Sequence, residues 1–322
     1  MMGKDSSISW TDHTFSPWWG CAKVSPGCEH CYADTFAKRV GHGKRLPTIW
    51  GPRAERRMMS DAHWREPERW NRAAEKVGKR ARVFCASMSD VFEDRPDLDE
   101  SRARLLALID DTPHLDWLLL TKRPEHADRL WKQALRDLEG AEADVHVTPW
   151  APNIWLGTTA EDQQRADERL PHLLDVPAAV RFVSYEPALG PVDFRPYLLP
   201  TPCSHAQASM ASGETFACSC PRRAGIDWII VGGESGPGAR PFDLAWMRST
   251  IEQCKAAGVA CFAKQLGAKP GEFAPTGRFR TNEGRRQMEM TATRLPLRDP
   301  KGGDWSEWPA DLRVREFPRG AS

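Results

Sequence analysis

Short, continuous apolar segments alternate with amphipathic helical patterns along most of this chain of 322 residues. The apolar segments occupy 81–87, 115–121, 153–159, 181–186, 226–233 and 258–265, and helical patterns occupy 97–111, 124–138, 161–174 and 243–257. Continuous apolar strands are typical of parallel sheets whose two faces are both covered. With an early strand near 8–11, the chain is predicted to form about seven strands. This length and pattern favour an α/β fold, a full or partial (β/α) barrel.

Polar residues follow the predicted strands where each strand ends. In parallel α/β folds the carboxyl ends of the strands meet at one edge, and ligands bind there. This position predicts site roles for Ser87, Ser89, Asp90, Lys122, Arg123, Thr158, Thr159, Glu186, Gly232, Gly233, Glu234 and Lys264. Among them, Lys122 and Arg123 suit a carboxylate or a phosphate. The alternative explanation is that strands simply become polar where they leave the core.

Charge and hydropathy limit the classes of partner. Lys and Arg number 45 and Asp and Glu 44, so the net charge of +1 does not by itself indicate a nucleic-acid partner. Local basic segments occur at 38–57 and 277–286, where a solvated loop is the more ordinary explanation. No segment approaches the about 20 apolar residues of a membrane span, and the N-terminal residues lack the apolar core of a signal peptide. We therefore expect a cytoplasmic protein with no membrane partner.

Three of the nine cysteines form a compact motif. Cys21, Cys28 and Cys31 have the spacing C-x6-C-x2-C, between the first predicted strand and a helix. Cys28 and Cys31 are expected to share one face of the first helical turn, with Cys21 returning from the preceding loop. Three thiolates without an obvious fourth ligand suit a [4Fe–4S] cluster that leaves one iron open. A structural zinc site needs four ligands, which His13 or His30 would complete, and unligated thiols are the third alternative.

A second group of metal-binding residue types lies in an insertion at 191–225. Its members are Cys203, His205, Cys218 and Cys220. Two close pairs bridged by a short loop are typical of a small zinc knuckle. An auxiliary Fe–S cluster and free thiols are the alternatives. We divide the chain into a barrel at 1–267 that contains this Cys-rich insertion and a polar C-terminal extension at 268–322.

Several segments together resemble a known family. They are W-x-x-C and S-P-G-C-x-x-C-Y around the three cysteines, S-Y-E-P-x-x-G at 184–190, V-G-G-E-S-G-P-G-A-R-P at 231–241 and K-Q at 264–265. They resemble a phage-encoded three-cysteine-motif family that is similar to the radical SAM superfamily, over about residues 5 to 267. The first cysteine spacing departs from the usual C-x3-C-x2-C of that superfamily, because six residues separate the first pair here.

The resemblance implies a cofactor, a reaction and residue roles. It implies a barrel of the radical SAM type, in which the open iron of the cluster binds S-adenosylmethionine (SAM) and one electron cleaves it to a radical that abstracts a substrate hydrogen. The segment at 232–234 resembles the Gly-Gly-Glu that holds the SAM amino group. Ser87, Ser89, Asp90, Thr158, Gly232, Gly233, Glu234 and Arg240 are then the expected cofactor-binding residues, and Glu186, Lys122, Arg123 and Lys264 the expected catalytic ones.

The resemblance also suggests a substrate. A phage setting suggests DNA hypermodification in the host cytoplasm, with remodelling or isomerisation of an amino-acid-modified thymine, as a base or a nucleotide. A flavodoxin or ferredoxin would donate the electron. Radical chemistry on a peptide or small metabolite is one alternative. A zinc-stabilised nucleic-acid-binding protein without catalysis is another, although a pure binder needs no ring of polar residues at the strand ends.

Overall fold

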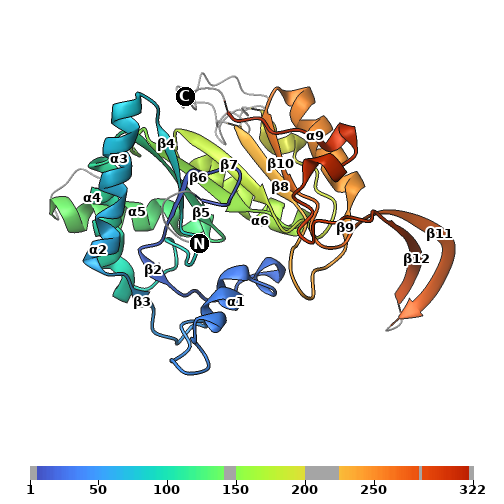
Figure 1. The fold of residues 1–322 in the computed structure, drawn as a ribbon, viewed down its shortest axis with the longest axis horizontal. Coiled ribbons are helices and arrows are strands. Elements are labelled where there is room, and N and C mark those ends of the chain that lie inside the picture. The colour runs from blue at the N-terminus through green and yellow to red at the C-terminus, as the bar shows by residue number, and fades with distance from the viewer. Residues whose placement is uncertain (1–5, 141–149, 200–224, 283–284, 319–322) are drawn as a thin grey trace, which may run out of the picture.

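Seven parallel strands form one curled sheet, a half-barrel, in the computed structural model (Figure 1). The structure describes residues 6–140, 150–199, 225–282 and 285–318. In spatial order the strands are β1 (His13–Phe15), β4 (Ala81–Cys85), β5 (Leu115–Thr121), β6 (Ile154–Thr159), β7 (Val180–Tyr185), β8 (Trp228–Gly232) and β10 (Ala260–Gln265). The predicted α/β partial barrel is confirmed. The first strand lies at 13–15 rather than at 8–11.

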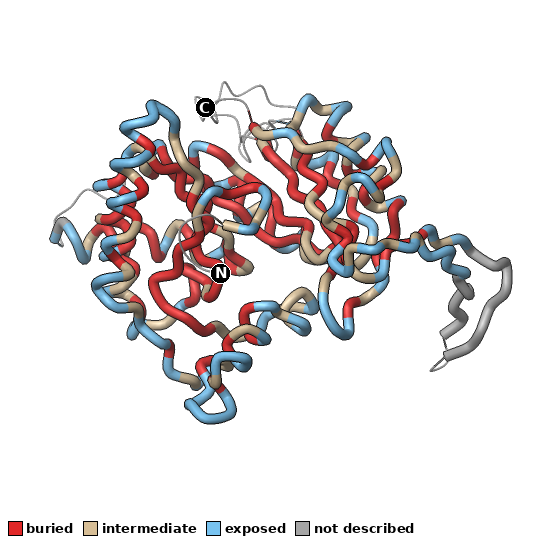
Figure 2. Tube along the Cα trace, viewed as in Figure 1, coloured by how far each residue is buried: buried red, intermediate tan, exposed pale blue. Residues whose placement is uncertain are grey.

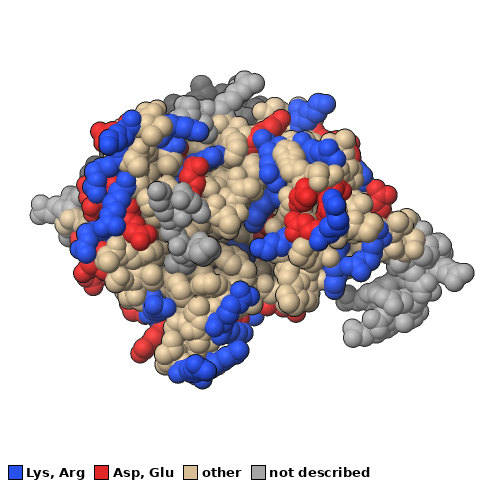
Figure 3. All heavy atoms as spheres, in the orientation of Figure 1, with Lys and Arg blue, Asp and Glu red and all other residues tan. Residues whose placement is uncertain are grey.

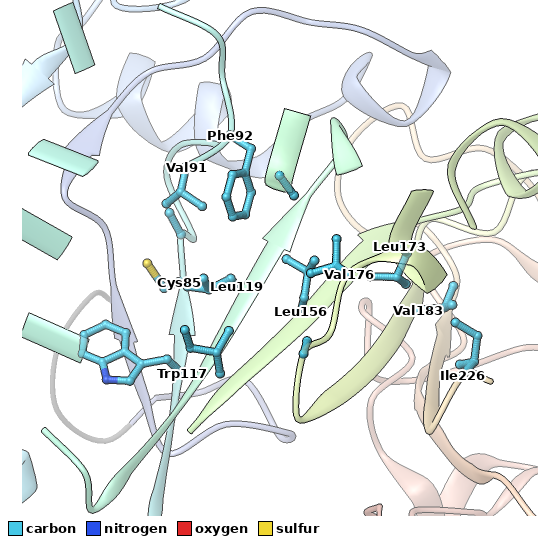
Figure 4. Packing of buried hydrophobic residues seen from close by; sticks show 14 of the residues in the cluster. Cys85, Val91, Phe92, Trp117, Leu119, Leu156, Leu173, Val176, Val183 and Ile226 are labelled. Atoms are coloured by element: carbon cyan, nitrogen blue, oxygen red, sulfur yellow. The ribbon is translucent and has the colours of Figure 1, made fainter. Parts of the chain in front are cut away.

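Helices cover the convex face of this sheet. They are α2 (Asp61–Trp64), α3 (Glu66–Val77), α4 (Asp99–Asp110), α5 (Ala127–Glu139), α6 (Gln163–Asp175), α7 (Arg195–Leu198) and α9 (Leu244–Ala257). Their apolar side chains form one buried cluster with strand residues such as Cys85, Leu119 and Val183 (Figure 4). Figure 2 shows that the strands are buried along most of their length. In the described part of the chain, no helix combines the length and apolar character that crossing a membrane requires.

The concave face has its own aromatic core. Phe84, Trp155, Phe182, Trp228 and Phe262 form a buried cluster there, closed by Trp10 from the N-terminal segment. Trp10 was expected in a strand, but its indole packs across this face, with its ring centroid 4.7 Å from that of Phe84. Strand side chains alternate between the two faces of a sheet. The same alternation, continued toward the carboxyl ends, places Lys122, Thr159, Glu186 and Lys264 above this aromatic core.

The C-terminal region contains a long hairpin. Strands β11 (Pro270–Asn282) and β12 (Arg285–Arg294) pair antiparallel, and β9 (Phe242–Asp243) pairs with the base of β11. Figure 1 shows the hairpin reaching away from the half-barrel. The sequence patterns at 268–322 had predicted only a polar extension, so the hairpin is an addition to that prediction.

After the hairpin the chain returns to the sheet through η4 (Trp305–Glu307) and η5 (Ala310–Leu312). The Ala263 amide donates to the Val314 carbonyl at 2.8 Å, and the Glu316 amide donates to the Cys261 carbonyl at 2.8 Å. These bonds satisfy backbone groups at the β10 edge, which would otherwise present unpaired donors and acceptors. The C-terminal segment therefore completes one edge of the half-barrel.

Candidate cysteine site at the carboxyl ends of the strands

The three cysteines lie in a loop at 20–31, which we call the cysteine loop. It follows β2 (Trp18–Trp19), which pairs with β3 (Arg57–Met58), and leads through η1 (Pro26–Cys28) to α1 (Tyr32–Arg39). Cys28 ends η1, whereas Cys31 precedes α1 with a non-helical backbone at ψ 122°. The expected shared helical turn is therefore wrong, because this non-helical residue separates two short helices. The thiols of Cys21, Cys28 and Cys31 are free and half-buried.

A buried ion pair anchors the start of the cysteine loop. Glu93 Oε1 accepts from the Ala22 amide at 3.2 Å and from Arg56 Nη2 at 2.7 Å. Arg56 also donates through Nη1 to the Ile49 carbonyl at 3.0 Å. The side chains of both partners are at most 6% exposed. The sequence reasoning missed Glu93 and Arg56; their only sequence signal was an acidic residue shortly after a strand.

Arg123 joins the first cysteine to the sheet. Its Nη1 lies 2.8 Å from Asp90 Oδ2 and 3.5 Å from Cys21 Sγ, and its Nη2 donates to the Ala22 carbonyl at 2.8 Å. Asp90 also accepts from Thr121 Oγ1 at 2.7 Å and from the Lys122 amide at 3.1 Å. Burial acts to raise the Asp90 pKa, but Arg123 and these donors outweigh it, so the pKa is lowered. Asp90 was expected to contact SAM; its oxygens are instead engaged in holding Arg123.

Glu161 anchors the middle of the cysteine loop. Its Oε1 accepts from the Gly27 amide at 3.0 Å, and its Oε2 lies 2.9 Å from Arg169 Nη1. Glu161 has no exposed surface. Its burial acts to raise the pKa, yet Arg169 together with Ser25 and Gly27 lowers it. Glu161 therefore holds the loop as a carboxylate, and it too was missed by the sequence reasoning.

Glu234 and Arg240 contact the last part of the cysteine loop. Arg240 Nη2 lies 2.6 Å from Glu234 Oε1, and the Arg240 amide donates to Oε2 at 2.8 Å. His30 Nδ1 is 3.1 Å from Glu234 Oε2, and Arg240 Nη1 donates to the Pro26 carbonyl at 3.0 Å. Burial opposes ionisation, but Arg240 and His30 lower the Glu234 pKa to about 2. The two residues predicted around 234–240 therefore lie together beside the cysteine loop.

The concave mouth below the cysteine loop carries two lysines. Lys122 Nζ donates to Thr159 Oγ1 at 3.2 Å. Lys264 Nζ lies 2.7 Å from Glu186 Oε1. Thr158, which was expected to contact cofactor, has no exposed surface, and its hydroxyl donates to the Thr121 carbonyl at 2.9 Å. Because side chains alternate along β6, the structure places Thr159 rather than Thr158 at this mouth.

The predicted serines lie on the segment after β4. Ser87 is 7% exposed, with its Oγ 3.4 Å from Ser16 Oγ, and its carbonyl accepts from the Tyr32 hydroxyl. Ser89 Oγ is buried and has no hydrogen-bond partner in the described part of the chain. Tyr32 therefore ties the start of α1 to the end of β4, and Ser89 keeps an unused hydroxyl beside them.

The predicted glycines are in contact with the chain itself. A Cβ on Gly232 would lie 3.2 Å from the Gln265 carbonyl oxygen, and one on Gly233 would lie 2.4 Å from the Leu266 carbonyl oxygen. A side chain at Gly233 would therefore clash with the backbone that follows β10. Close packing between β8 and β10 is sufficient to require glycine here, whatever else approaches it.

The cysteine loop offers donors that suit a three-cysteine cluster. Burial raises the pKa of Cys21 to about 12, with Asp90 adding to the rise and Arg123 opposing it, so its thiolate needs a compensating positive centre such as a metal. Cys31 and Trp50 both pack against a buried apolar group that contains Trp19. The indole nitrogens of these two tryptophans are buried donors without a partner in the described residues. Buried donors of this kind suit sulfur acceptors, so the residues present fit such a group.

No three His, Cys, Asp or Glu side chains converge on one ion position within the residues that the structure describes. The ligands of a four-iron cluster bind separate corners of a cube, so they do not converge on one point. The second predicted group, Cys203, His205, Cys218 and Cys220, lies outside the described residues, and its zinc site stays a prediction.

Fold and site define an α/β half-barrel protein with a three-cysteine loop anchored over the carboxyl ends of its strands. The chain belongs to the family of proteins of unknown function DUF5131, whose model matches residues 5–296. The matched region includes the cysteine loop, all seven strands of the sheet and the hairpin. No curated protein and no solved structure matches the chain.

Proposed function

We propose that this protein is a radical SAM enzyme whose [4Fe–4S] cluster is held by Cys21, Cys28 and Cys31. The observation that carries the proposal is the placement of the three-cysteine loop. Side chains that follow four different strands, Glu93, Arg123, Glu161 and Arg240, hold this loop over the mouth of the half-barrel. A half-barrel of this kind is compatible with an enzyme.

The chain's own residues would position the group and exclude water. When bound, the cluster and SAM supply a radical that removes a hydrogen atom from the substrate. Arg123 orients Cys21, and the ion pairs of Glu93 and Glu161 fix the loop around it. The aromatic core around Trp155 and Trp228 closes the concave side below the mouth, which keeps bulk water from entering there.

The contacts of the strand-end residues change some of the roles that the sequence predicted for them. Asp90 acts through Arg123 rather than on the cofactor directly. Ser89, with its unused hydroxyl, and Glu234 with Arg240 stay our candidates for contact with SAM. Lys122 and Lys264, with Glu186, are the candidates for contact with the substrate. Ser87, Gly232 and Gly233 would contribute through their backbone or packing.

We infer a pyrimidine substrate, an amino-acid-modified thymine in phage DNA or its nucleotide, which the enzyme would remodel or isomerise. Exposed Lys38, Arg39, Lys44 and Arg45 on and after α1 support an anionic partner next to the cysteine loop. Figure 3 shows Lys and Arg gathered over this part of the molecule. In duplex DNA the base would have to leave the stack to reach the mouth, whereas a nucleotide avoids that cost. A flavodoxin or ferredoxin would supply the electron.

Anaerobic reconstitution with iron and sulfide tests the proposal. We expect a brown protein with about four irons, the number in the cluster, that forms 5′-deoxyadenosine from SAM on reduction with dithionite. Alanine at Cys21, Cys28 or Cys31 should abolish this, whereas Cys85→Ala is the matched control, because Cys85 lies on the convex face of β4. A colourless protein with stoichiometric zinc on the three cysteines would contradict the proposal.

The substrate inference has its own comparison. SAM cleavage should rise with modified DNA or the modified nucleotide, relative to peptide pools and to no addition. Stimulation by peptides alone would replace the pyrimidine substrate and leave the radical SAM proposal intact. The predicted zinc at Cys203, His205, Cys218 and Cys220 is tested by anomalous scattering at the zinc edge, where a missing peak excludes the metal.

A further inference from the structure

The charged side chains around the concave mouth and the anchors of the cysteine loop fall into pairs. Five of these arginines and lysines have a carboxylate within 2.9 Å. The pairs are Arg56 with Glu93, Arg123 with Asp90, Arg169 with Glu161, Arg240 with Glu234 and Lys264 with Glu186. Lys122 differs from these five, since its amine donates to the Thr159 hydroxyl at 3.2 Å and has no carboxylate partner among the described residues.

The two lysines at the mouth, Lys122 and Lys264, differ in whether a carboxylate is paired with them. Lys122 comes directly after β5 and Lys264 lies near the end of β10. Both side chains are on the concave side of the sheet, and both are half-buried. Lys264 is neutralised by Glu186 at 2.7 Å, whereas Lys122 has no carboxylate within 4.0 Å in the described part of the chain. Glu161 is close enough for the Lys122 charge to help lower its pKa. However, both Glu161 oxygens already accept from Gly27 and Arg169.

The position of Lys122 places its charge under the cysteine loop. Its backbone amide donates to Asp90, whose carboxylate holds Arg123 against Cys21. Its side chain reaches Thr159, two residues before the Glu161 that holds Gly27. Lys122 therefore lies between two of the loop's anchors, Arg123 and Glu161. A half-buried ammonium with no carboxylate paired to it is available to an anionic ligand.

We propose that Lys122 Nζ and Thr159 Oγ1 form a binding subsite for an oxyanion of the substrate, a carboxylate or a phosphate. The inference rests on the proposed function in one respect. In a radical SAM enzyme the open iron would bind the carboxylate of SAM, so the anion at Lys122 would belong to the substrate. A hydroxyl and an ammonium, both donors, suit an acceptor-only group. Such a subsite would select substrates with an anionic group at a fixed distance from the reacting carbon.

Binding to the cluster-free full-length protein tests this subsite independently of catalysis. The probes are inorganic phosphate, thymidine 5′-monophosphate against thymidine, and N-acetylglycine as a carboxylate, measured by calorimetry. Lys122→Gln should weaken binding of the preferred anion about tenfold, which corresponds to about 1.4 kcal/mol. Lys122→Arg should retain most of the affinity. Lys132→Gln, which removes a lysine paired with Asp128 on α5, is the matched charge control and should change nothing.

Thr159→Val gives a second variant in case Lys122→Gln disturbs folding, which circular dichroism would report. It should weaken the same probe by a smaller factor. Preference for phosphate over N-acetylglycine would identify a nucleotide, and the reverse an amino-acid appendage. Unchanged affinity in Lys122→Gln, or no binding of any probe to the wild-type protein, overturns the inference. So does a loss confined to SAM binding by the cluster-loaded protein. Iron content and SAM cleavage report separately on the proposed function.

Discussion

The Arg123 guanidinium lies 3.5 Å from Cys21 Sγ and 2.8 Å from Asp90 Oδ2, so a single side chain connects a cysteine of the loop to a buried carboxylate. Cys21 and Arg123 are separated by 102 residues in the sequence. The contact exists because the cysteine loop crosses the carboxyl ends of the strands, where β5 delivers Arg123. Each further anchor of the loop has the same origin, a residue that follows a strand and reaches up to the loop backbone.

Removing Asp90 should destabilise the protein strongly. Asp90→Ala removes the nearest carboxylate from the Arg123 side chain, which is only 8% exposed, and leaves only Glu93 at 4.0 Å. Breaking a buried pair in this way costs about 3–5 kcal/mol, measured as the free energy of unfolding in urea. Asp97→Ala is the control, because Asp97 pairs with Arg95 at the surface and such pairs contribute about 0–1 kcal/mol. Equal effects of the two substitutions would contradict a stabilising role for the Asp90–Arg123 pair.

Variants of the Glu161–Arg169 pair distinguish the anchoring of the cysteine loop from the stability of the protein. Glu161→Ala should lower the free energy of unfolding by about 3–5 kcal/mol, because it leaves the buried Arg169 charge without its carboxylate partner. The double variant Glu161→Leu with Arg169→Met should regain much of that stability, since apolar replacements of a buried pair are often neutral or better. It still lacks an acceptor for the Gly27 amide. We therefore expect Cys28 to react faster with iodoacetamide in the double variant than in the wild type. Equal rates would show that Glu161 does not hold the loop.

The Glu234 carboxylate gives a pH dependence with a defined sign. Its pKa falls from 4.5 to about 2 in the folded protein, because Arg240 and His30 outweigh its burial. A carboxyl group with a lowered folded pKa contributes stability above its unfolded pKa and loses it on acidification. The stability difference between wild type and Glu234→Gln should therefore be constant above pH 4.5 and shrink as the pH falls toward 2. Unfolding free energies of both proteins across this range measure it, and a difference that does not vary with pH would refute the assignment.

The strands could be predicted from the sequence because each is a continuous apolar run. The run at 115–121 coincides with β5, and the others agree within a few residues. The first strand was misplaced because Trp10 looks like a strand residue, while His13–Phe15 is set by pairing with β4 rather than by hydrophobicity. The hairpin at 270–294 was missed, because its sequence has no continuous apolar run like those of the sheet strands.

The position of the candidate site was predictable, but the pairing within it was not. Strand ends identified Asp90, Arg123 and Glu234 as site residues, and the family resemblance added Arg240. Which of them hold the loop depends on contacts across long separations, such as the 134 residues between Gly27 and Glu161. The end of β6 offered both Thr158 and Thr159, and only the structure shows that they face opposite sides of the sheet.

The Arg123 contact predicts how the proposed cluster would respond to substitution. A positively charged N–H near a cysteine sulfur favours the more negative, reduced state of an Fe–S cluster, and hydrogen bonds to sulfur are among the factors that set its potential. Arg123→Gln removes this charge beside Cys21, so the midpoint potential should become more negative. We expect a shift on the order of 60 mV, the value that corresponds to a tenfold change for one electron. Arg123→Lys, which keeps the charge, should shift the potential less. Potentiometric titration followed by electron paramagnetic resonance measures both, with Arg95→Gln at the surface as the control. Identical potentials in the wild type and Arg123→Gln would show that Arg123 holds the loop without influencing the cluster.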